Sequence, residues 1–254
     1  MARFLFALIC FAALSVTAGE PSTAPLPASP ADLEFDHLWI VVTRDAPERA
    51  ALERTGLKIS PGVNRNDGQG TASVAAEFLN SYVELMWPDP TVSVAAGAER
   101  GAEKFKNRMN WRTSGWCPLG IGLHRRAGSV PPLPFPTWSI APDWMPKGSF
   151  IEILTARDDT KSPSFFIEPP ALAVKEKAQS DRASNHPAGV ERVTAIQLVR
   201  PKEYQPSAPF TYLEKAGIFK SIEGKDWAIE ITFDAGRKSQ TKDLRPDLPL
   251  VIHY

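Results

Sequence analysis

The hydrophobic pattern of residues 34–88 predicts one supersecondary unit. Residues 35–42 form an apolar, β-branched run of the kind found in a buried strand. A helix is expected next, with Asp45 as its N-cap in a capping box. A short strand follows, and then residues 71–79 and 81–87 read as two strands joined by a tight turn. The expected order of elements is βαβββ.

The same order of elements recurs twice along the chain. Residues 115–170 contain strand-like segments, but a proline-rich stretch at 130–136 occupies the place of the helix, so this second unit is expected to lack it. Residues 190–254 again predict a strand, a helix that begins at Ser207 and further strands. Repeated units usually bury their faces against one another. The predicted fold class is therefore α+β, built from repeated βαβββ modules without a flexible linker.

Two ionisable residues occupy positions where the first unit should be apolar. His37 lies near the start of the first strand, on the same face as Trp39. Glu84 lies in the middle of the last strand, on the same face as Tyr82 and Met86. A buried carboxylate needs a partner, water or a metal ion. We therefore expect a site around His37 and Glu84, with the three neighbours as candidate substrate-binding residues.

These residues resemble a known family. The sequences Asp-His-Leu at 36–38 and Tyr-Val-Glu-Leu at 82–85, within a βαβββ unit, are similar to the glyoxalase-like members of the vicinal oxygen chelate superfamily. The resemblance implies curved, mostly antiparallel sheets around a cup. It also implies that His37 on the first strand and Glu84 on the fourth bind a divalent metal ion. The glyoxalase-like domain would span residues 34–170, with modules at 34–88 and 115–170, and the third module, 190–254, would pack on it.

The resemblance leaves the third metal ligand open. Glu168 aligns with Glu84 in the second unit and would complete the set if the first and second units pair. His253, in the last strand, can also be aligned with Glu84 and would take that role if the first and third units pair. A set of histidine and carboxylate ligands suits Zn, Mn, Ni or Fe(II).

Two classes of function follow. The first is a metal-dependent enzyme of lyase, isomerase or dioxygenase type, in which the ion polarises an oxygen of a small molecule. Its catalytic residues are not identified by the sequence. The alternative is a non-catalytic protein that binds or sequesters a small molecule in the same cup and needs no metal. A full set of ligands facing one cavity would favour the enzyme, whereas a lone pair of His37 and Glu84 would favour the binding protein.

The N-terminal residues predict export. Residues 1–18 combine a basic start, a short apolar run and small residues at the exit, which is typical of a cleaved signal peptide and too short for a membrane span. Residues 19–33 are rich in proline, alanine and serine and are expected to form a disordered tether. The mature protein is therefore expected to be secreted or periplasmic and free of the membrane. Its one remaining cysteine, Cys117, is expected in the core.

Composition points to a small molecule as the partner. The chain has 29 basic and 29 acidic residues and no basic stripe interleaved with aromatic residues, which argues against nucleic acid. The sequence contains no nucleotide-binding loop, nucleophile elbow or Cys-x-x-Cys motif. A homodimer is compatible with the sequence.

Overall fold

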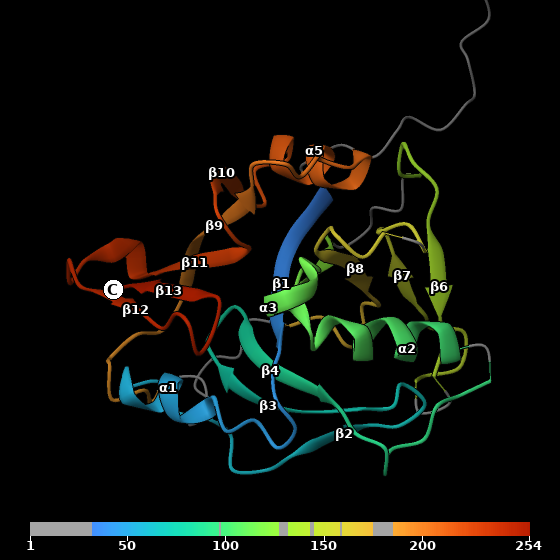
Figure 1. Cartoon of the computed structure of the whole chain (residues 1–254), viewed down its shortest axis with the longest axis horizontal. Helices are drawn as coiled ribbons and strands as arrows, with labels where there is room; N and C mark the ends of the chain where they lie inside the picture. The colour runs from blue at the N-terminus through green and yellow to red at the C-terminus, as the bar shows by residue number, and fades with distance from the viewer. Residues whose placement is uncertain (1–31, 97, 127–131, 143–144, 158, 175–184) are drawn as a thin grey trace, which may run out of the picture.

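Curled mixed sheets dominate the structure. The computed structural model describes residues 32–254, apart from residues 97, 127–131, 143–144, 158 and 175–184. Within this part the strands form a half-barrel with few helices, so the protein belongs to the α+β class (Figure 1). The predicted signal peptide, residues 1–18, and almost all of the predicted tether lie outside the described residues. None of the described helices is long and apolar enough to span a membrane.

An eight-stranded sheet contains the strands up to Glu168. Its order is β2-β3-β4-β1-β5-β8-β7-β6. β1 and β5 pair antiparallel at its centre, whereas β4 pairs parallel with β1 and β8 pairs parallel with β5. Read outward from the central pair, the two halves therefore have the same strand order. The strands are β1 (Leu33–Val41), β2 (Asn64–Asn66), β3 (Thr71–Glu77), β4 (Tyr82–Pro88), β5 (Leu119–Arg125), β6 (Trp138–Ile140), β7 (Ile151–Ile153) and β8 (Ser164–Glu168).

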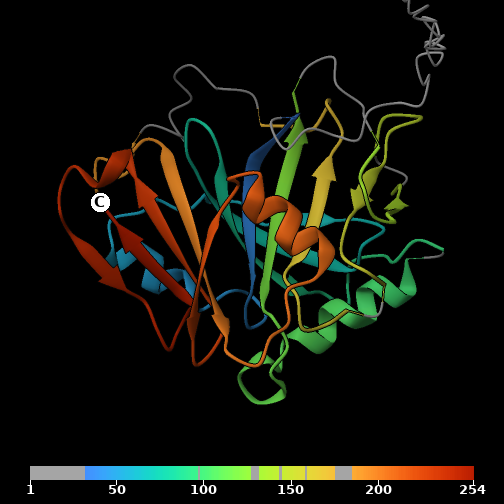
Figure 2. The same ribbon diagram turned by 90° about the horizontal axis from the view of Figure 1, so that it is seen from above.

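A five-stranded sheet follows, in the order β10-β9-β11-β13-β12. It lies beside the larger sheet (Figure 2). In it, β9 lies between β10 and β11, whereas β1 of the larger sheet lies beside β4, the last strand of its own half. The order of strands around β9 thus differs from the order around β1. The strands are β9 (Val193–Pro201), β10 (Lys220–Gly224), β11 (Ala228–Phe233), β12 (Thr241–Asp243) and β13 (Leu250–His253).

The helices lie outside the sheets, and one of the two N-caps predicted from the sequence is present. They are α1 (Arg49–Arg54), α2 (Glu99–Arg108), α3 (Trp111–Ser114), α5 (Ala208–Lys215) and the 3-10 helix η2 (Asp234–Gly236). As predicted, Ser207 caps α5, and its hydroxyl accepts a hydrogen bond from the backbone N–H of Phe210 at 3.4 Å. The capping box predicted at Asp45 is wrong. Asp45 has a left-handed φ of 64°, and the helix begins after Glu48, whose carboxylate accepts hydrogen bonds from Thr43 instead.

Residues along the central strands alternate between two hydrophobic clusters. Leu38 and Ile40 of β1 belong to a large core that also includes residues of the smaller sheet, α1 and α5. Trp39 of β1, Met86 of β4 and Phe166 of β8 belong to a second, smaller cluster. This division follows from the two-residue period of a strand. The second cluster supplies part of the lining of the site described below.

Two glycines of β5 make room for the rings of β1. A Cβ atom added to Gly120 would lie 1.9 Å from the ring of Trp39, and one added to Gly122 would lie 2.6 Å from the ring of His37. Each glycine is the cross-strand partner of the residue whose ring covers it. The two glycines therefore allow both rings to lie directly against the backbone of β5.

Replacing Gly120 by alanine is expected to lower the free energy of unfolding by about 1–3 kcal/mol, because the new methyl group overlaps the Trp39 ring. Denaturant titration measures the change. The matched control is Gly101→Ala in α2, where no atom lies within 4 Å of the added Cβ. Alanine favours a helix over glycine by about 0.5–1 kcal/mol, so the control should be as stable as the parent or more so. Equal stability of Gly120→Ala and the parent would contradict the close packing.

Candidate functional site

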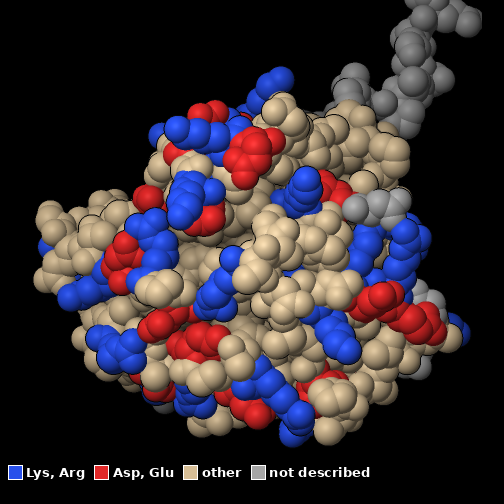
Figure 3. All heavy atoms as spheres, in the orientation of Figure 1, with Lys and Arg blue, Asp and Glu red and all other residues tan. Residues whose placement is uncertain are grey.

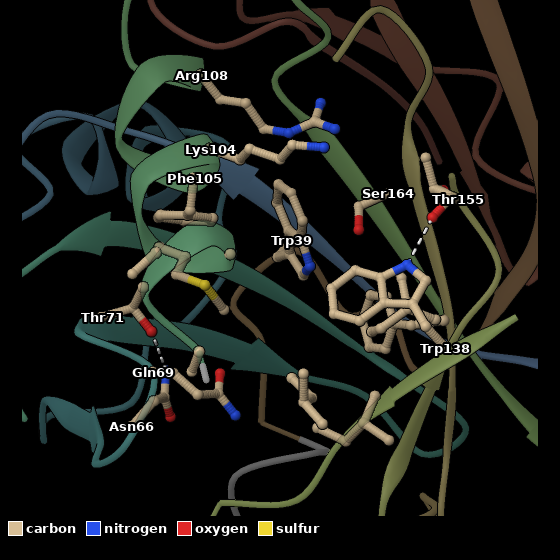
Figure 4. Close-up of a pocket in the computed structure, with 18 of the residues that line it drawn as sticks. Trp39, Asn66, Gln69, Thr71, Lys104, Phe105, Arg108, Trp138, Thr155 and Ser164 are labelled. Carbon is tan, nitrogen blue, oxygen red and sulfur yellow. Dashed lines mark hydrogen bonds between the residues drawn. The ribbon is translucent and has the colours of Figure 1, made fainter. Parts of the chain in front are cut away.

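A cavity of about 390 Å³ lies over the central strands of the larger sheet. Strands β1, β4 and β8 line its base, α2 lines one side and the β6–β7 hairpin lines the other. Figure 4 shows side chains of α2 on one side of Trp39 and Trp138 on the other. Trp39 meets Phe105 of α2 edge to face, with ring centroids 5.3 Å apart. We call this cavity the cup.

The cup contains all but one of the residues singled out in the sequence. His37, Glu84 and Glu168 line it, and so do the predicted substrate-binding residues Trp39, Tyr82 and Met86. His253, the alternative third ligand, lies elsewhere. It is on β13 and lines a separate outer groove, where its Nε2 is 3.1 Å from a carboxylate oxygen of Glu230. Because β1 pairs with β5, Glu168 rather than His253 shares a cavity with His37.

The ring of His37 is held by a buried aspartate. Its Nδ1 lies 2.7 Å from Oδ1 of Asp36, and its ring stacks on that of Tyr82 with centroids 4.2 Å apart. The second oxygen of Asp36 accepts hydrogen bonds from Nδ1 of His124 at 3.0 Å and from the backbone N–H of Val174 at 2.7 Å. An ionised Asp36 requires His37 to donate from Nδ1. Among the described residues, Nε2 of His37 has no hydrogen-bond partner.

A bulge in β1 brings the side chains of Asp36 and His37 together. The register between β1 and β5 shifts between Phe35 and His37, so Asp36 is an extra residue in β1. This bulge explains how the neighbouring side chains of Asp36 and His37 meet. In the sequence, Asp36 stands out only as part of the family pattern. The available signal was a carboxylate beside a histidine in an apolar strand.

Mutual charge sets the ionisation of Asp36 and His37. Burial alone would raise the pKa of Asp36, but hydrogen bonds from His124 and His37 hold that pKa well below its usual range. Burial alone would lower the pKa of His37. The hydrogen bond to Asp36 and its negative charge outweigh burial and raise the pKa of the imidazole. The pair therefore favours an ionised Asp36 beside a readily protonated His37.

For the two glutamates of the cup, unlike Asp36, burial outweighs the other contributions and the pKa rises. Burial raises the pKa of Glu84 from its ordinary value, although the nearby charge of His37 counteracts the rise. It raises the pKa of Glu168 to about 7, where His37 again counteracts and the charges of Asp36 and Glu84 add to the rise. One carboxylate oxygen of Glu168 is buried without a hydrogen-bond partner in the described structure. A carboxyl group with a pKa near neutrality can both accept and donate a proton.

The predicted metal ligands do not form a ligand set as they stand. In the part of the chain that the structure describes, no three His, Cys, Asp or Glu side chains come together closely enough to hold a metal ion. One feature does suit a ligand. A histidine that binds a metal usually donates its other ring nitrogen to a carboxylate, as His37 does to Asp36. His37, Glu84 and Glu168 are thus separate groups around one cavity rather than a preassembled centre.

Helix α2 supplies a wall of the cup that was not expected from the sequence. Arg100, Lys104 and Arg108 follow one another at intervals of four residues, which places them on one face of the helix, and all three line the cup. Phe105 lines it as well. The sequence showed an amphipathic helix, but a helical period does not reveal what the helix covers.

Cys117 lies in the main core as predicted, and burial raises the pKa of its thiol to about 12.

Comparison with known proteins yields structural likeness but no family. No protein-family model matches the chain, and no curated protein matches it. Among solved structures, a hypothetical protein from Staphylococcus aureus is similar, with a TM-score of 0.47 and 13% sequence identity. The match covers 87% of this chain and 98% of that chain. A likeness at this level says nothing about ligand or activity, so the function is argued from the residues of the cup.

The raised pKa of Glu168 predicts a pH dependence of stability. The folded protein holds this proton more tightly than the unfolded chain, whose carboxyl pKa is near 4.5. The resulting stability is fully present below that value and is lost as the pH rises through about 7. Glu168→Gln, which stays neutral, should therefore lose less stability than the parent between about pH 5 and pH 8.

Denaturant titrations at several pH values measure this difference. Glu53→Gln, which removes an exposed carboxyl of α1, controls for the change in net charge. Parallel pH profiles of stability for the parent and Glu168→Gln would show that Glu168 titrates normally.

Proposed function

We propose that this protein is a glyoxalase-like binding protein whose cup takes up a small, flat, mostly apolar molecule that bears a polar group. The cup itself carries the proposal. It is a cavity of about 390 Å³ with Trp39, Phe105 and Trp138 in its walls and acidic and basic side chains among them. Binding sites for small molecules typically combine apolar walls with a small number of placed polar groups.

The strand order supports the glyoxalase-like part of the proposal. On either side of the β1–β5 pair, the first strand of each half lies beside the last, and the other two follow outward. This is the order expected if two βαβββ modules, residues 34–88 and 115–170, pair through their first strands. The helix α1 follows β1 in the first half, while the second half has the proline-rich segment in that place. Residues 190–254 would then be a further unit packed on this domain, and residues 1–18 would direct export.

A catalytic role is the second candidate, and the ionisable groups of the cup favour it. Glu168 has a pKa of about 7, and His37 presents an unpartnered ring nitrogen while Asp36 holds its other one. A base and an acid so placed could move a proton on a bound oxygen compound. The lyase, isomerase or dioxygenase chemistry implied by the family resemblance belongs to this candidate. Its metal-dependent form requires His37, Glu84 and Glu168 to close together on a Zn, Mn, Ni or Fe ion.

Binding in the cup predicts a response to loss of its aromatic wall. 1-Naphthol, an uncharged flat probe, should quench tryptophan fluorescence on binding. Phe105→Ala should weaken that binding about 5- to 30-fold, since losing one buried aromatic contact costs about 1–2 kcal/mol. Phe150→Ala is the matched control, because Phe150 is half exposed and does not line the cup. Equal losses in the two variants, or none in either, would contradict binding in the cup.

Metal titration tests the metal-dependent form. Isothermal titration with Zn, Mn, Ni or Fe(II) salts should show a site that His37→Ala or Glu84→Ala weakens at least about tenfold. His253→Ala, which alters the outer groove, should leave that site unchanged. If the parent and His37→Ala bind each ion equally, the metal-dependent form is wrong and the binding-protein candidate stands.

A further inference from the structure

We infer that the ligand of the cup is an anion, specifically an aromatic carboxylate, and that Arg108 binds its charged group. This inference rests on the proposed binding function of the cup and adds the class of ligand. Three observations carry it: the buried charge of Arg108, the position of that charge within the cup, and the row of basic side chains on α2.

Arg108 is a buried cation whose hydrogen-bond acceptors are neutral. The residue is 6% exposed, and its Nη1 donates to the backbone carbonyl oxygens of Cys117 and Ser162. Among the described residues, no carboxylate forms an ion pair with its guanidinium. The charge of Asp159 acts on it without an ion pair, and the carboxylate of Asp159 accepts hydrogen bonds from the backbone N–H groups of Lys161 and Ser162. A guanidinium stays charged, and burying it without a counter-ion is costly.

The position of Arg108 makes that charge available to a ligand. Arg108 lines the cup, and neither its Nε nor its Nη2 donates to a described residue. Figure 4 shows its guanidinium near Lys104 on the side of α2 that faces Ser164. Ser164 and Glu168 lie at opposite ends of β8, about 13 Å apart at the rise of a strand. Arg108 contacts Ser162, beyond Ser164, so Arg108 and Glu168 mark opposite ends of the cup.

The basic row on α2 is a local feature. Figure 3 shows acidic and basic side chains interspersed over the face that it draws, as expected for a chain with balanced charge. Inside the cup, however, three of the four arginine and lysine residues, Arg100, Lys104 and Arg108, come from the same helix face, and the fourth is Arg157. The acids Glu84 and Glu168 come from the sheet, and Asp159 lines the cup as well. An anionic group beside α2 would compensate the buried charge, and a cationic group there would be repelled.

The space between the two ends suits an aromatic ring. Trp39 and Phe105 lie next to the basic row, and Trp138 faces them across the cavity. A planar carboxylate matches the geometry of a guanidinium and can accept two parallel hydrogen bonds from it. A ring that carries a carboxylate would therefore place its charge at Arg108 and its far edge toward His37 and Glu168.

Two probes of the same shape test the inference. 2-Naphthoate and 2-naphthamide differ in charge but little in size. The parent protein should bind the carboxylate at least about tenfold more tightly than the amide, by isothermal titration at low ionic strength, and salt should reduce the difference. Arg108→Gln should bind both probes with about equal affinity, and Arg108→Lys should keep part of the preference.

Arg108 also braces two backbone carbonyls, so circular dichroism and thermal melts must show that its variants fold. If they do not, Lys104→Gln provides the test, because it should reduce the preference for the carboxylate about threefold. Lys215→Gln, an exposed lysine of α5 outside the cup, is its matched control and should keep the full preference.

The outcomes separate the two proposals. Equal affinity of the parent for both probes would overturn the anion inference and leave the binding function standing. A preference for the carboxylate that survives in folded Arg108→Gln would overturn the role of Arg108. Failure of both probes, and of 1-naphthol, to bind would overturn the binding function and the inference with it.

Discussion

The antiparallel pairing of β1 with β5 is the contact on which the rest of the structure depends. It joins the two halves of the larger sheet edge to edge and so creates one continuous base for the cup. It also sets Gly120 and Gly122 opposite Trp39 and His37, so that the two rings lie across the neighbouring strand. Side chains in place of these hydrogens would push both rings into the cavity. The shape of the cup therefore depends on the absence of side chains at two glycines of β5 as much as on the two rings of β1.

The same pairing explains which parts of the site could be predicted. Strand periodicity was enough to place Trp39 with His37 on one face of the first strand and Tyr82 and Met86 with Glu84 on one face of another, because alternation is a local property. The choice between Glu168 and His253 was not local, since it depended on which two strands meet at the centre of the sheet. The prediction kept both alternatives for that reason. The register of β1 against β5 then puts Glu168 in the cup and His253 in the outer groove.

Other features were missed for distinct physical reasons. The N-cap expected at Asp45 failed because the backbone there turns through left-handed φ values, and a capping motif does not reveal such a turn. The bulge at Asp36 was missed because an inserted residue leaves the apolar pattern of a short strand nearly unchanged. The basic side chains of helix α2 were not assigned to the site, because a helical period does not show what a helix covers. They line the cavity because α2 and the β6–β7 hairpin stand on opposite sides of the cup.

The ionisation of the carboxyl groups in and beside the cup depends on their hydrogen-bond partners. Asp36 accepts hydrogen bonds from three donors and is held ionised. One buried oxygen of Glu168 has no donor, and the pKa of Glu168 is raised to about 7. Two carboxyl groups so close in the fold therefore differ in protonation near neutral pH. Arg108, at the other end, keeps its charge because a guanidinium does not lose its proton, whereas the carboxylate of Glu168 can take one up. The cup thus carries a permanent positive charge at one end and an adjustable acid at the other, and an aromatic carboxylate held at Arg108, as proposed, would present its far edge to that acid.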